Sequence, residues 1–493
     1  MQTLFEINTR VWLNEIERRT GSSRLDSVPE SELQAIQDSG FDQVWLMGVW
    51  QTGSAGRMIS RTRDDWRGEL LESLEDLRLE DISGSPYAVK DYTVHADFGG
   101  NEALLHFRER LHKRGIKLLL DLVPNHTAID HRWAWSNPEF YVHGDTLDFL
   151  REPNNFIEVQ TSAGSRIIAH GRDPYFPGWP DTLQLNYCSP GLRQAMLQEI
   201  KKISDLCDGV RCDMAMLLLP DVIQRTWGDL SKPIDGSTPS TRCFWEDAIP
   251  QIKKAHKDFI FMAEVYWDLE WDLQQLGFNY TYDKRLYDRL KQTDIPGVRG
   301  HLKADLAFQS KLVRFLENHD EQRARATFPD AMHKAAAIIT FSIPGLRFFY
   351  EGQLDGRRKR ASVHLGRRAV EELSPDIRSF YDLLLKKLPD NNGDFVVLEP
   401  RSAWEGNATN SNYICHSWFA AKTPQMVIAV NYSPVQSQCY VTLPTKILEG
   451  KKIKLRDRLS TTVYERSGSD LCNGGLYLDL KPWQYHIFDI EIA

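Results

Sequence analysis

The sequence predicts an α/β protein, a (β/α)8 or TIM barrel with a domain inserted after the third strand and a C-terminal antiparallel β-sandwich domain. Three observations predict it. Short apolar runs alternate with helix-like segments over the first 390 residues. One connection between them is far longer than the rest. After Asn391-Asn392-Gly393, short strands divided by turn residues replace the alternation.

The barrel is predicted from eight apolar runs. Near-continuous apolar strands alternating with helices are typical of a parallel sheet covered on both faces. Eight such units favour a closed barrel, and a doubly wound open sheet is the alternative on pattern alone. The runs are residues 5–13, 41–50, 115–123, 206–213, 258–267, 277–283, 311–320 and 342–350.

The domain ranges follow from the breaks in this pattern. The catalytic barrel is predicted over 1–127 and 186–390. The aromatic-rich segment 128–185 is too long for a plain connection and is predicted to be an inserted domain with a functional role, because long loops are usually functional. Residues 391–493 are predicted to form the C-terminal β-domain, from short strands separated by turns.

Composition excludes several classes of protein. The net charge of −8 argues against nucleic acid as a partner, and no apolar run is long enough to span a membrane. The beginning, MQTLFEINTRVWL, lacks the features of a signal peptide. The seven cysteines lack CxxC spacing and are interpreted as reduced thiols. We therefore expect a cytoplasmic protein.

Polar residues gather where the predicted strands end. In a (β/α)8 barrel the C-terminal ends of the strands surround one mouth, where the chemistry takes place. The candidates are Asp121, Asn125 and His126 after the third strand, Arg211 and Asp213 after the fourth, Glu264 after the fifth, and Asn318, His319 and Asp320 after the seventh.

Three carboxylates among these residues indicate sugar chemistry. Two carboxyl groups across a glycosidic bond, one protonated and one ionised, are the minimum for glycoside hydrolysis. Arg211 beside Asp213 favours the ionised form, which suits a nucleophile, and the apolar run around Glu264 suits a general acid. Asp320 is left to stabilise positive charge on the sugar. Taken alone, Arg211 and Asp213 are also compatible with a structural ion pair.

Four short motifs resemble those of the α-amylase family of glycoside hydrolases, in the family's order. They are DLVPNHT (121–127), GVRCDMAM (209–216), FMAEVYW (261–267) and FLENHDE (315–321), with QLN (184–186) similar to a fifth. The stretch YAVKDYTVHADFGG (87–100) also resembles the family's segment before the third strand. The resemblance covers about residues 1–350 and implies that the inserted segment 128–185 is the family's domain B.

The resemblance implies a role for each candidate in a reaction that retains anomeric configuration. Asp213 would be the nucleophile, Glu264 the general acid/base and Asp320 the transition-state stabiliser. Arg211, His126 and His319 would hold the sugar, and Tyr87 would stack on its ring. Asp121 would orient Arg211. The implied substrate is an α-glucan or a small α-glucoside.

Departures from the family pattern bear on specificity. Typical members carry Lys-His three and four residues after the nucleophile, where this chain has Met216 and Leu217, so an apolar acceptor side is expected. Asn125 matches a calcium ligand of many amylases. No partner ligands are identified and no HxH or HExxH spacing is present, so no metal or other cofactor is expected to be required, with calcium left open.

The sequence is therefore compatible with three functions. The first is a hydrolase of α-glucans or α-glucosides. The second is a transglycosylase or isomerase of the same family, which passes the glycosyl group to a sugar acceptor. The third is a non-catalytic binding relative, which is disfavoured because all three carboxylates are present.

Overall fold

The computed structural model describes residues 1–388 and 393–492 and contains a closed eight-stranded barrel. Its strands are Thr3–Asn8 (β1), Gln43–Met47 (β2), Lys117–Leu122 (β5), Gly209–Cys212 (β10), Ile260–Ala263 (β11), Tyr280–Tyr282 (β12), Leu312–Arg314 (β13) and Leu346–Tyr350 (β14). They close in the order β1-β14-β13-β12-β11-β10-β5-β2. The pairs β2–β5, β5–β10, β10–β11, β11–β12 and β13–β14 are parallel. The predicted barrel is confirmed.

The described chain falls into two compact units, and each is described by itself. The first comprises Phe5–Tyr282 and Arg360–Val370, and the second comprises Met1–Leu4, Asp283–Lys359 and Glu371–Ala493. These units are defined by compactness, whereas the domain ranges predicted above are defined by the strand pattern. The predicted ranges therefore stay a prediction. Their last boundary, between residues 390 and 391, lies outside the described residues.

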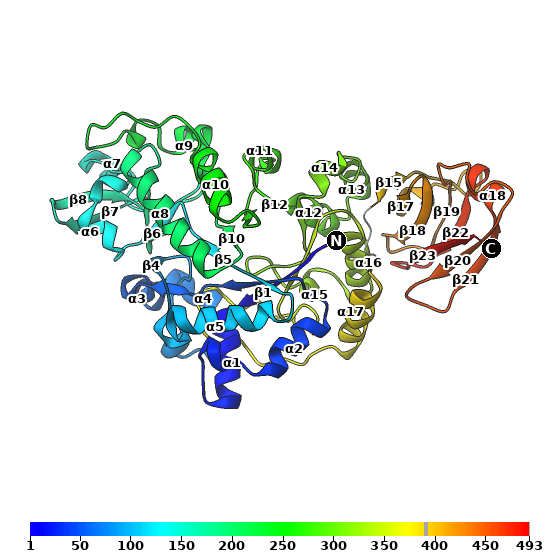
Figure 1. Ribbon diagram of the computed structural model, residues 1–493, viewed down its shortest axis with the longest axis horizontal. Coiled ribbons are helices and arrows are strands. Elements are labelled where there is room, and N and C mark those ends of the chain that lie inside the picture. Colours follow the sequence, from blue (N-terminus) through cyan, green and yellow to red (C-terminus); the bar gives the residue numbers. More distant parts are fainter. Residues whose placement is uncertain (389–392, 493) are drawn as a thin grey trace. The chain divides into compact units, whose positions relative to one another are not determined.

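Helices of the first unit begin and end at residues suited to capping. The Asn8 side chain accepts a hydrogen bond from the Val11 amide, so α1 begins at Thr9 and the apolar run predicted as one strand over 5–13 is divided. Ser189 and Pro190 start α8 in the same manner. The helices, labelled in Figure 1, are Thr9–Thr20 (α1), Glu30–Asp38 (α2), Ser54–Thr62 (α3), Asp64–Ser73 (α4), Gly100–His112 (α5), Pro190–Leu206 (α8), Pro220–Trp227 (α9), Phe244–Ala255 (α10) and Glu270–Gln275 (α11).

The long connection between β5 and β10 has structure of its own, coloured cyan to green in Figure 1. At its base two short strands pair antiparallel, His126–Ala128 (β6) and Thr182–Gln184 (β9). A hairpin of Phe156–Thr161 (β7) and Gly164–Ala169 (β8) follows two short helices, Arg132–Ser136 (α6) and Thr146–Arg151 (α7). Another antiparallel pair, Trp50–Thr52 (β3) with Val89–Val94 (β4), lies earlier in the chain.

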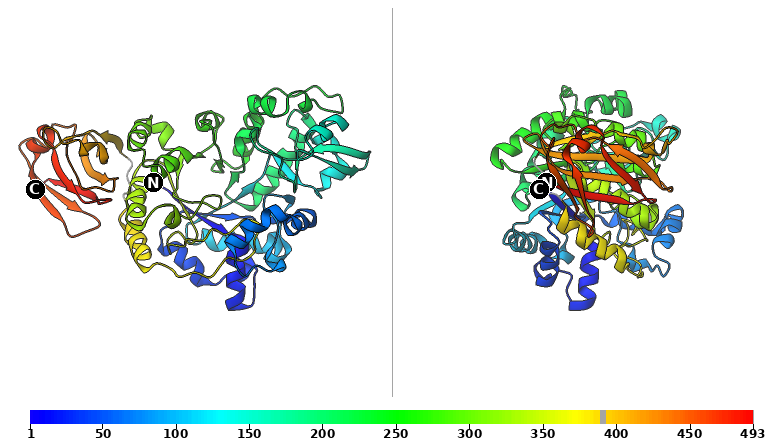
Figure 2. Two further views of the ribbon diagram at one scale, coloured as in Figure 1. Left: turned by 180° about the vertical axis from the view of Figure 1, so that it is seen from behind. Right: turned by 90° about the vertical axis from the view of Figure 1, so that its right-hand side faces the viewer.

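The second unit carries the antiparallel C-terminal strands, orange to red in Figure 2. A six-stranded sheet has the order β15-β17-β18-β23-β20-β21 and a three-stranded sheet the order β16-β19-β22. The strands are Asp394–Leu398 (β15), Pro400–Ser402 (β16), Tyr413–Ala420 (β17), Thr423–Asn431 (β18), Ser437–Val441 (β19), Lys452–Asp457 (β20), Val463–Ser467 (β21), Leu476–Leu480 (β22) and Tyr485–Ile492 (β23). Apolar side chains from both sheets, such as Val427 and Leu478, share one core. The predicted β-domain is confirmed.

The described α-helices of the second unit precede the β-domain in the chain, except for a short one within it. They are Lys284–Lys291 (α12), Ile295–His301 (α13), Leu306–Gln309 (α14), Ala324–Thr327 (α15), Asp330–Ser342 (α16) and Pro375–Lys387 (α17), with Gly468–Asn473 (α18) in the β-domain. In the parts of the chain that the structure describes, no helix combines the length and apolar character needed to cross a bilayer.

Candidate active site

Asp213 and Glu264 each follow the last residue of neighbouring barrel strands. Cys212 ends β10 and Ala263 ends β11, and these two residues are paired in the parallel register. The Asp213 amide donates to the Leu122 carbonyl of β5 at 2.8 Å, and the Glu264 amide donates to the Cys212 carbonyl at 3.0 Å. The sheet ladder therefore fixes both carboxylates side by side at one edge.

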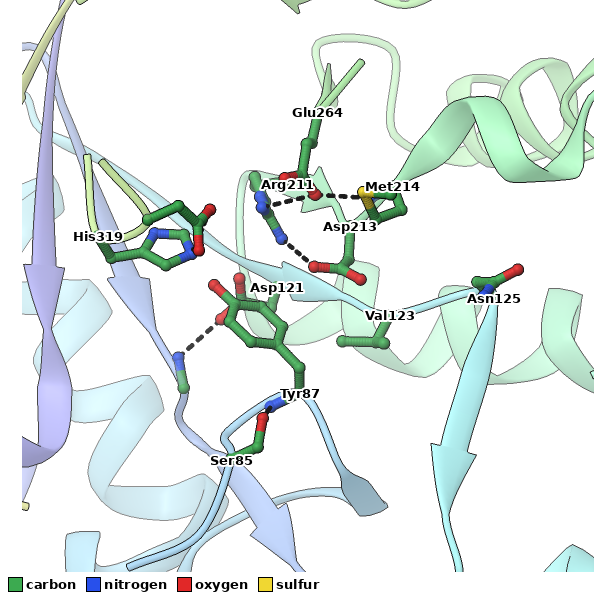
Figure 3. Close-up of polar contacts among 12 residues, drawn as sticks. Ser85, Tyr87, Asp121, Val123, Asn125, Arg211, Asp213, Met214, Glu264 and His319 are labelled. Atoms are coloured by element: carbon green, nitrogen blue, oxygen red, sulfur yellow. Dashed lines mark hydrogen bonds and ion pairs between the residues drawn. The ribbon is translucent and has the colours of Figure 1, made fainter. Parts of the chain in front are cut away.

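Arg211 joins the two carboxylates. Its Nη1 lies 2.5 Å from Oδ1 of Asp213 and its Nη2 lies 2.8 Å from Oε2 of Glu264, as Figure 3 shows. The three side chains are buried, with at most 8% of any one exposed. One guanidinium fork spans only a few ångströms, so it holds both acids close together.

An aromatic cage surrounds this arginine. The guanidinium carbon lies 5.2 Å from the ring centres of Trp45 and Tyr87 and 5.8 Å from that of Tyr282. Burial alone lowers the pKa of Arg211, but Glu264, the tyrosines and Asp213 raise it well above its ordinary value. The arginine is therefore a permanent cation beside the two acids.

Asp121 supports the cage from β5, where it is paired in register with Arg211. Its Oδ1 accepts from the Trp45 indole at 3.2 Å and its Oδ2 from the Gly48 amide at 2.7 Å. Gly48 has φ +79°, and a Cβ there would lie 2.7 Å from Pro86, which precedes Tyr87. Asp121 thus orients Arg211 by holding Trp45 against it.

Hydrogen-bond donors surround Glu264, whereas the sequence led us to expect an apolar environment. Oε1 accepts from the Tyr266 hydroxyl at 2.8 Å, and Oε2 accepts from the Met214 amide at 2.7 Å as well as contacting Arg211. Met214 adopts the left-handed conformation, φ +43°, which turns its amide toward the acid. The expectation of an apolar pocket is wrong because the donors come from the neighbouring strand end and from two residues further along the chain.

His126 lies in β6 and contacts the loop that carries Tyr87. Its ring is hydrogen-bonded to the Tyr87 backbone and packs 5.0 Å from the Trp179 ring. Burial lowers the pKa of His126 to about 3, so the imidazole is neutral near pH 7. A neutral, buried imidazole beside Tyr87 suits hydrogen bonding to a sugar hydroxyl.

His319 and Asp320 belong to the second unit. They follow β13, and His319 Nε2 lies 3.1 Å from Oδ2 of Asp320. The Asn318 side chain accepts from the Asp320 and Glu321 amides at 3.0 and 2.9 Å and shapes this turn. His319 is buried and Asp320 is exposed. The structure thus brings together Tyr87, His126, Arg211, Asp213 and Glu264, and it pairs His319 with Asp320.

The residues around Asn125 do not fit a calcium site. Its Oδ1 accepts from Nε2 of Gln184 at 3.0 Å, and its Nδ2 donates to Oε1 of Gln184 at 3.2 Å. The amide is therefore occupied by another amide rather than facing carboxylates, the ligands that calcium prefers. Within residues 1–388 and 393–492, no group of three His, Cys, Asp or Glu side chains is placed to hold a metal.

The run after the nucleophile does not offer an apolar surface. Met216, Leu217 and Leu218 form a short 3-10 helix, Ala215–Leu218, and are buried. The expectation that these residues contact an acceptor is wrong, because the turn at Met214 directs them into the protein interior.

An exposed tyrosine, Tyr175, packs on the half-buried Trp267, which lies three residues after Glu264. The rings of Trp267 and Tyr175 meet edge to face at 5.1 Å, and the Arg225 guanidinium lies 5.6 Å from each ring. Tyr175 is 60% exposed. Flat aromatic faces beside a cation are suited to binding sugar rings.

Several of these residues escaped the sequence analysis. Trp45 and Tyr282 lie in strands and are indistinguishable by pattern from core aromatics. Tyr266 had a usable signal, because it lies two residues after Glu264 within FMAEVYW. Trp133, in the inserted segment, is buried against Phe140.

Comparison with known proteins identifies the family. The model of the alpha amylase catalytic domain matches residues 25–363. The chain belongs to the alpha-amylase family. Alpha-amylase MalA of Haloarcula japonica is 26% identical over 311 residues, 59% of this chain and 41% of the relative. Trehalose synthase/amylase TreS of Mycolicibacterium smegmatis is 34% identical over 143 residues, 26% of this chain and 23% of the relative.

Solved structures of family members share the fold. The maltogenic alpha-amylase AmyB of Thermotoga neapolitana superimposes with a TM-score of 0.67 and 17% identity, over 100% of this chain and 99% of that one. Matches to the first curated relatives cover less than two thirds of those proteins, 41% of one and 62% of the next.

Proposed function

We propose that this member of the alpha-amylase family is a retaining glycoside hydrolase that cleaves α-glucosidic bonds of an α-glucan or a small α-glucoside. The observation that carries the proposal is the single buried guanidinium that holds Asp213 and Glu264 together. Carboxyl groups about 5 Å apart are typical of retaining enzymes, and wider spacing leaves room for the water of inverting ones. Sharing one arginine favours the closer spacing.

In the proposed first step, Asp213 attacks the anomeric carbon as a carboxylate. The bond to the leaving oxygen breaks, and Glu264 gives that oxygen a proton. The sugar is then joined to Asp213 through an ester. In the second step Glu264 takes a proton from water, the resulting hydroxide attacks the anomeric carbon, and Asp213 leaves as a carboxylate.

Arg211 serves the nucleophile in this scheme. Its charge favours ionised Asp213, and Trp45, Tyr87 and Tyr282 keep it in place. Glu264 accepts three hydrogen bonds in the free enzyme, which favours its carboxylate form. Acid catalysis therefore requires that a donor be released when substrate arrives. Catalytic hydrogen bonds commonly form only in the substrate complex.

Sugar binding is assigned to Tyr87, His126, Arg211 and His319. Tyr87 would stack on the ring, and neutral His126 would bond to a hydroxyl. We extend the proposal to Asp320 as the carboxylate that stabilises the positively charged transition state, on the strength of its place in the motif FLENHDE. No metal or other cofactor takes part in the proposed steps.

Transfer to a sugar is the second candidate. It is favoured by the similarity over 143 residues to a relative named trehalose synthase/amylase. The Tyr175 and Trp267 rings would hold an acceptor sugar, which would replace water in the second step. Both candidates need the same nucleophile.

Product analysis tests the proposal. The purified chain is incubated with maltotriose, starch, sucrose and trehalose, with and without added glucose. Hydrolysis yields new reducing ends in proportion to substrate lost, whereas transfer yields rearranged sugars without them. The Asp213→Asn variant should lose activity by orders of magnitude while keeping the circular dichroism spectrum of the parent. Turnover unchanged by Asp213→Asn would overturn the proposal.

A further inference from the structure

A cavity of about 870 Å3 in the first unit is lined by acidic and basic side chains, with the basic ones in excess. Its walls come from α1, the start of α3, the loop before Tyr87 and the segment around Arg367. Arg211, Asp213, Glu264 and Tyr87 are not among its lining residues. Its volume lies at the upper end of the range for small-molecule sites.

Part of the acidic lining of the cavity is neutralised within the protein. Arg367 lies 2.9 Å from Asp76 and 2.6 Å from Asp81. The charge of Asp97 acts on Arg10 and favours a higher pKa. Seven arginine and lysine side chains line the cavity against five aspartates and glutamates, so positive charge remains in excess.

Four arginines of the cavity, Arg10, Arg18, Arg57 and Arg61, form no ion pair with a carboxylate among the residues that the structure describes. Arg10 donates to the Gly84 carbonyl at 2.6 Å and to the Thr52 hydroxyl at 2.9 Å, both neutral acceptors. Arg61 donates to the Ile82 carbonyl at 3.1 Å.

Arg57 is exposed, and its side chain has no hydrogen bond or ion pair in the described part of the chain. Burial and the neighbouring positive charge of Arg57 lower the pKa of Arg10 to about 10, and the charge of Asp97 opposes this shift.

We propose that this cavity binds a phosphate monoester dianion, carried by a sugar. An excess of guanidinium groups around one cavity favours a multivalent anion, and their planar forks match phosphate oxygens. The cavity is far larger than a bare phosphate ion requires, which favours an ester with an organic part. The choice of a sugar as that part rests on the proposed function.

The cavity is connected to the carboxylate site through one loop. Arg10 bonds to the Gly84 carbonyl, and Gly84 lies three residues before Tyr87, whose ring packs on Arg211. Gly84 has φ +85°, and a Cβ there would lie 3.0 Å from the Arg57 backbone, so the loop rests directly on α3. An anion bound between Arg10 and Arg57 therefore lies against the loop that positions Tyr87.

Isothermal titration calorimetry tests the proposal with inorganic phosphate, glucose 6-phosphate and glucose as titrants. The test variant is Arg57→Gln, whose exposed side chain has no partner to lose. The matched control is Arg151→Gln, which removes the same charge from the exposed end of α7. We expect saturable phosphate binding that weakens with added salt, falls roughly tenfold or more in Arg57→Gln and is unchanged in Arg151→Gln.

Different outcomes separate the sources of the anion. Tighter binding of glucose 6-phosphate than of inorganic phosphate assigns the dianion to a sugar ester, and equal binding of the two assigns it to free phosphate. Equal binding of phosphate by both variants, or no saturable binding by the parent, overturns the site. Maltotriose hydrolysis, measured on the same samples, reports separately on the proposed function, because Arg57 takes no part in the chemistry.

Discussion

The Tyr266 hydroxyl donates a hydrogen bond of 2.8 Å to Oε1 of Glu264, two residues before it in the chain. The other carboxylate oxygen, Oε2, is occupied by Arg211 and by the Met214 amide. Tyr266 therefore donates to one oxygen of Glu264, Oε1, while Arg211 contacts the other. This places the tyrosine in a position to set the protonation of the proposed general acid.

Tyr266→Phe should move the alkaline limb of the activity profile to higher pH. The substitution removes a donor that favours the carboxylate, so Glu264 stays protonated to higher pH. A hydrogen bond to a charged group contributes about 1.5 kcal/mol, which corresponds to a shift of about one pH unit. The measurement is kcat/KM for maltotriose across pH. Tyr477→Phe, in β22, is the control, and a limb that moves equally in both variants would contradict the assignment.

Arg211→Lys should reduce kcat/KM by roughly a hundredfold or more. A lysine ammonium is a compact point charge, whereas the guanidinium bonds Asp213 and Glu264 through two separate nitrogens. The variant keeps the positive charge, so a loss of this size isolates the bidentate geometry. Steady-state kinetics on maltotriose and the thermal midpoint are measured together. Near-parental kinetics would show that charge alone suffices.

The barrel was predictable from the alternation of strands and helices. Arg211 and Asp213, two residues apart at the end of one strand, were expected beside each other, and the structure joins them at 2.5 Å. The environment of Glu264 was not predictable, because one of its donors is a backbone amide turned inward by the left-handed Met214. A sequence pattern indicates which side chains are present but not which way a backbone amide points.

Aromatic residues mark the other limit of prediction from sequence. The positions of Trp45 and Tyr282 in strands predict core residues, and both are buried. They also enclose the Arg211 guanidinium. Met216 and Leu217 are the opposite case. Their apolar side chains were predicted to contact an acceptor, but they are buried in the core. A residue at a strand end can be both buried and functional. Residue type alone therefore does not distinguish a core residue from a functional one.

Tyr175→Ala should weaken binding of longer glucans. The Tyr175 ring is exposed and packs against Trp267, three residues after Glu264, so we expect it to contact sugar on the leaving side. Loss of about 1 kcal/mol of stacking raises KM for maltoheptaose about fivefold, with a smaller effect on 4-nitrophenyl α-glucoside. Phe176→Ala is the matched control, because Phe176 is equally exposed and adjacent. The same rise in KM in both variants would refute a specific role for Tyr175.

Removal of calcium should leave the protein unchanged. The Asn125 amide is paired with the Gln184 amide, so a cation at this place would have to break two hydrogen bonds. We expect the thermal midpoint and the activity on maltotriose to be the same after dialysis against EDTA and after readdition of calcium. A midpoint that falls in EDTA and recovers with calcium, but not with magnesium, would support the calcium site that the match at Asn125 left open.

His416→Gln should make stability less dependent on pH. His416 is buried in β17, and its Nε2 lies 2.9 Å from the Ser342 hydroxyl of α16. Burial lowers the pKa of His416 to about 3, against about 6.5 in the unfolded chain. Below pH about 6.5 the unfolded state therefore binds a proton that the folded state excludes, and the free energy of unfolding falls as pH falls.

The size of this effect is set by one proton. The histidine contributes a slope of up to about 1.4 kcal/mol per pH unit between pH about 6.5 and about 3, and glutamine removes it while keeping a polar group for Ser342. Urea unfolding followed by circular dichroism between pH about 4.5 and about 6.5 measures the slope. His106→Gln, at an exposed position of α5, serves as the control. A slope that is the same in His416→Gln and the parent would mean that His416 is protonated in the folded protein, with the Ser342 hydroxyl insufficient to keep it neutral.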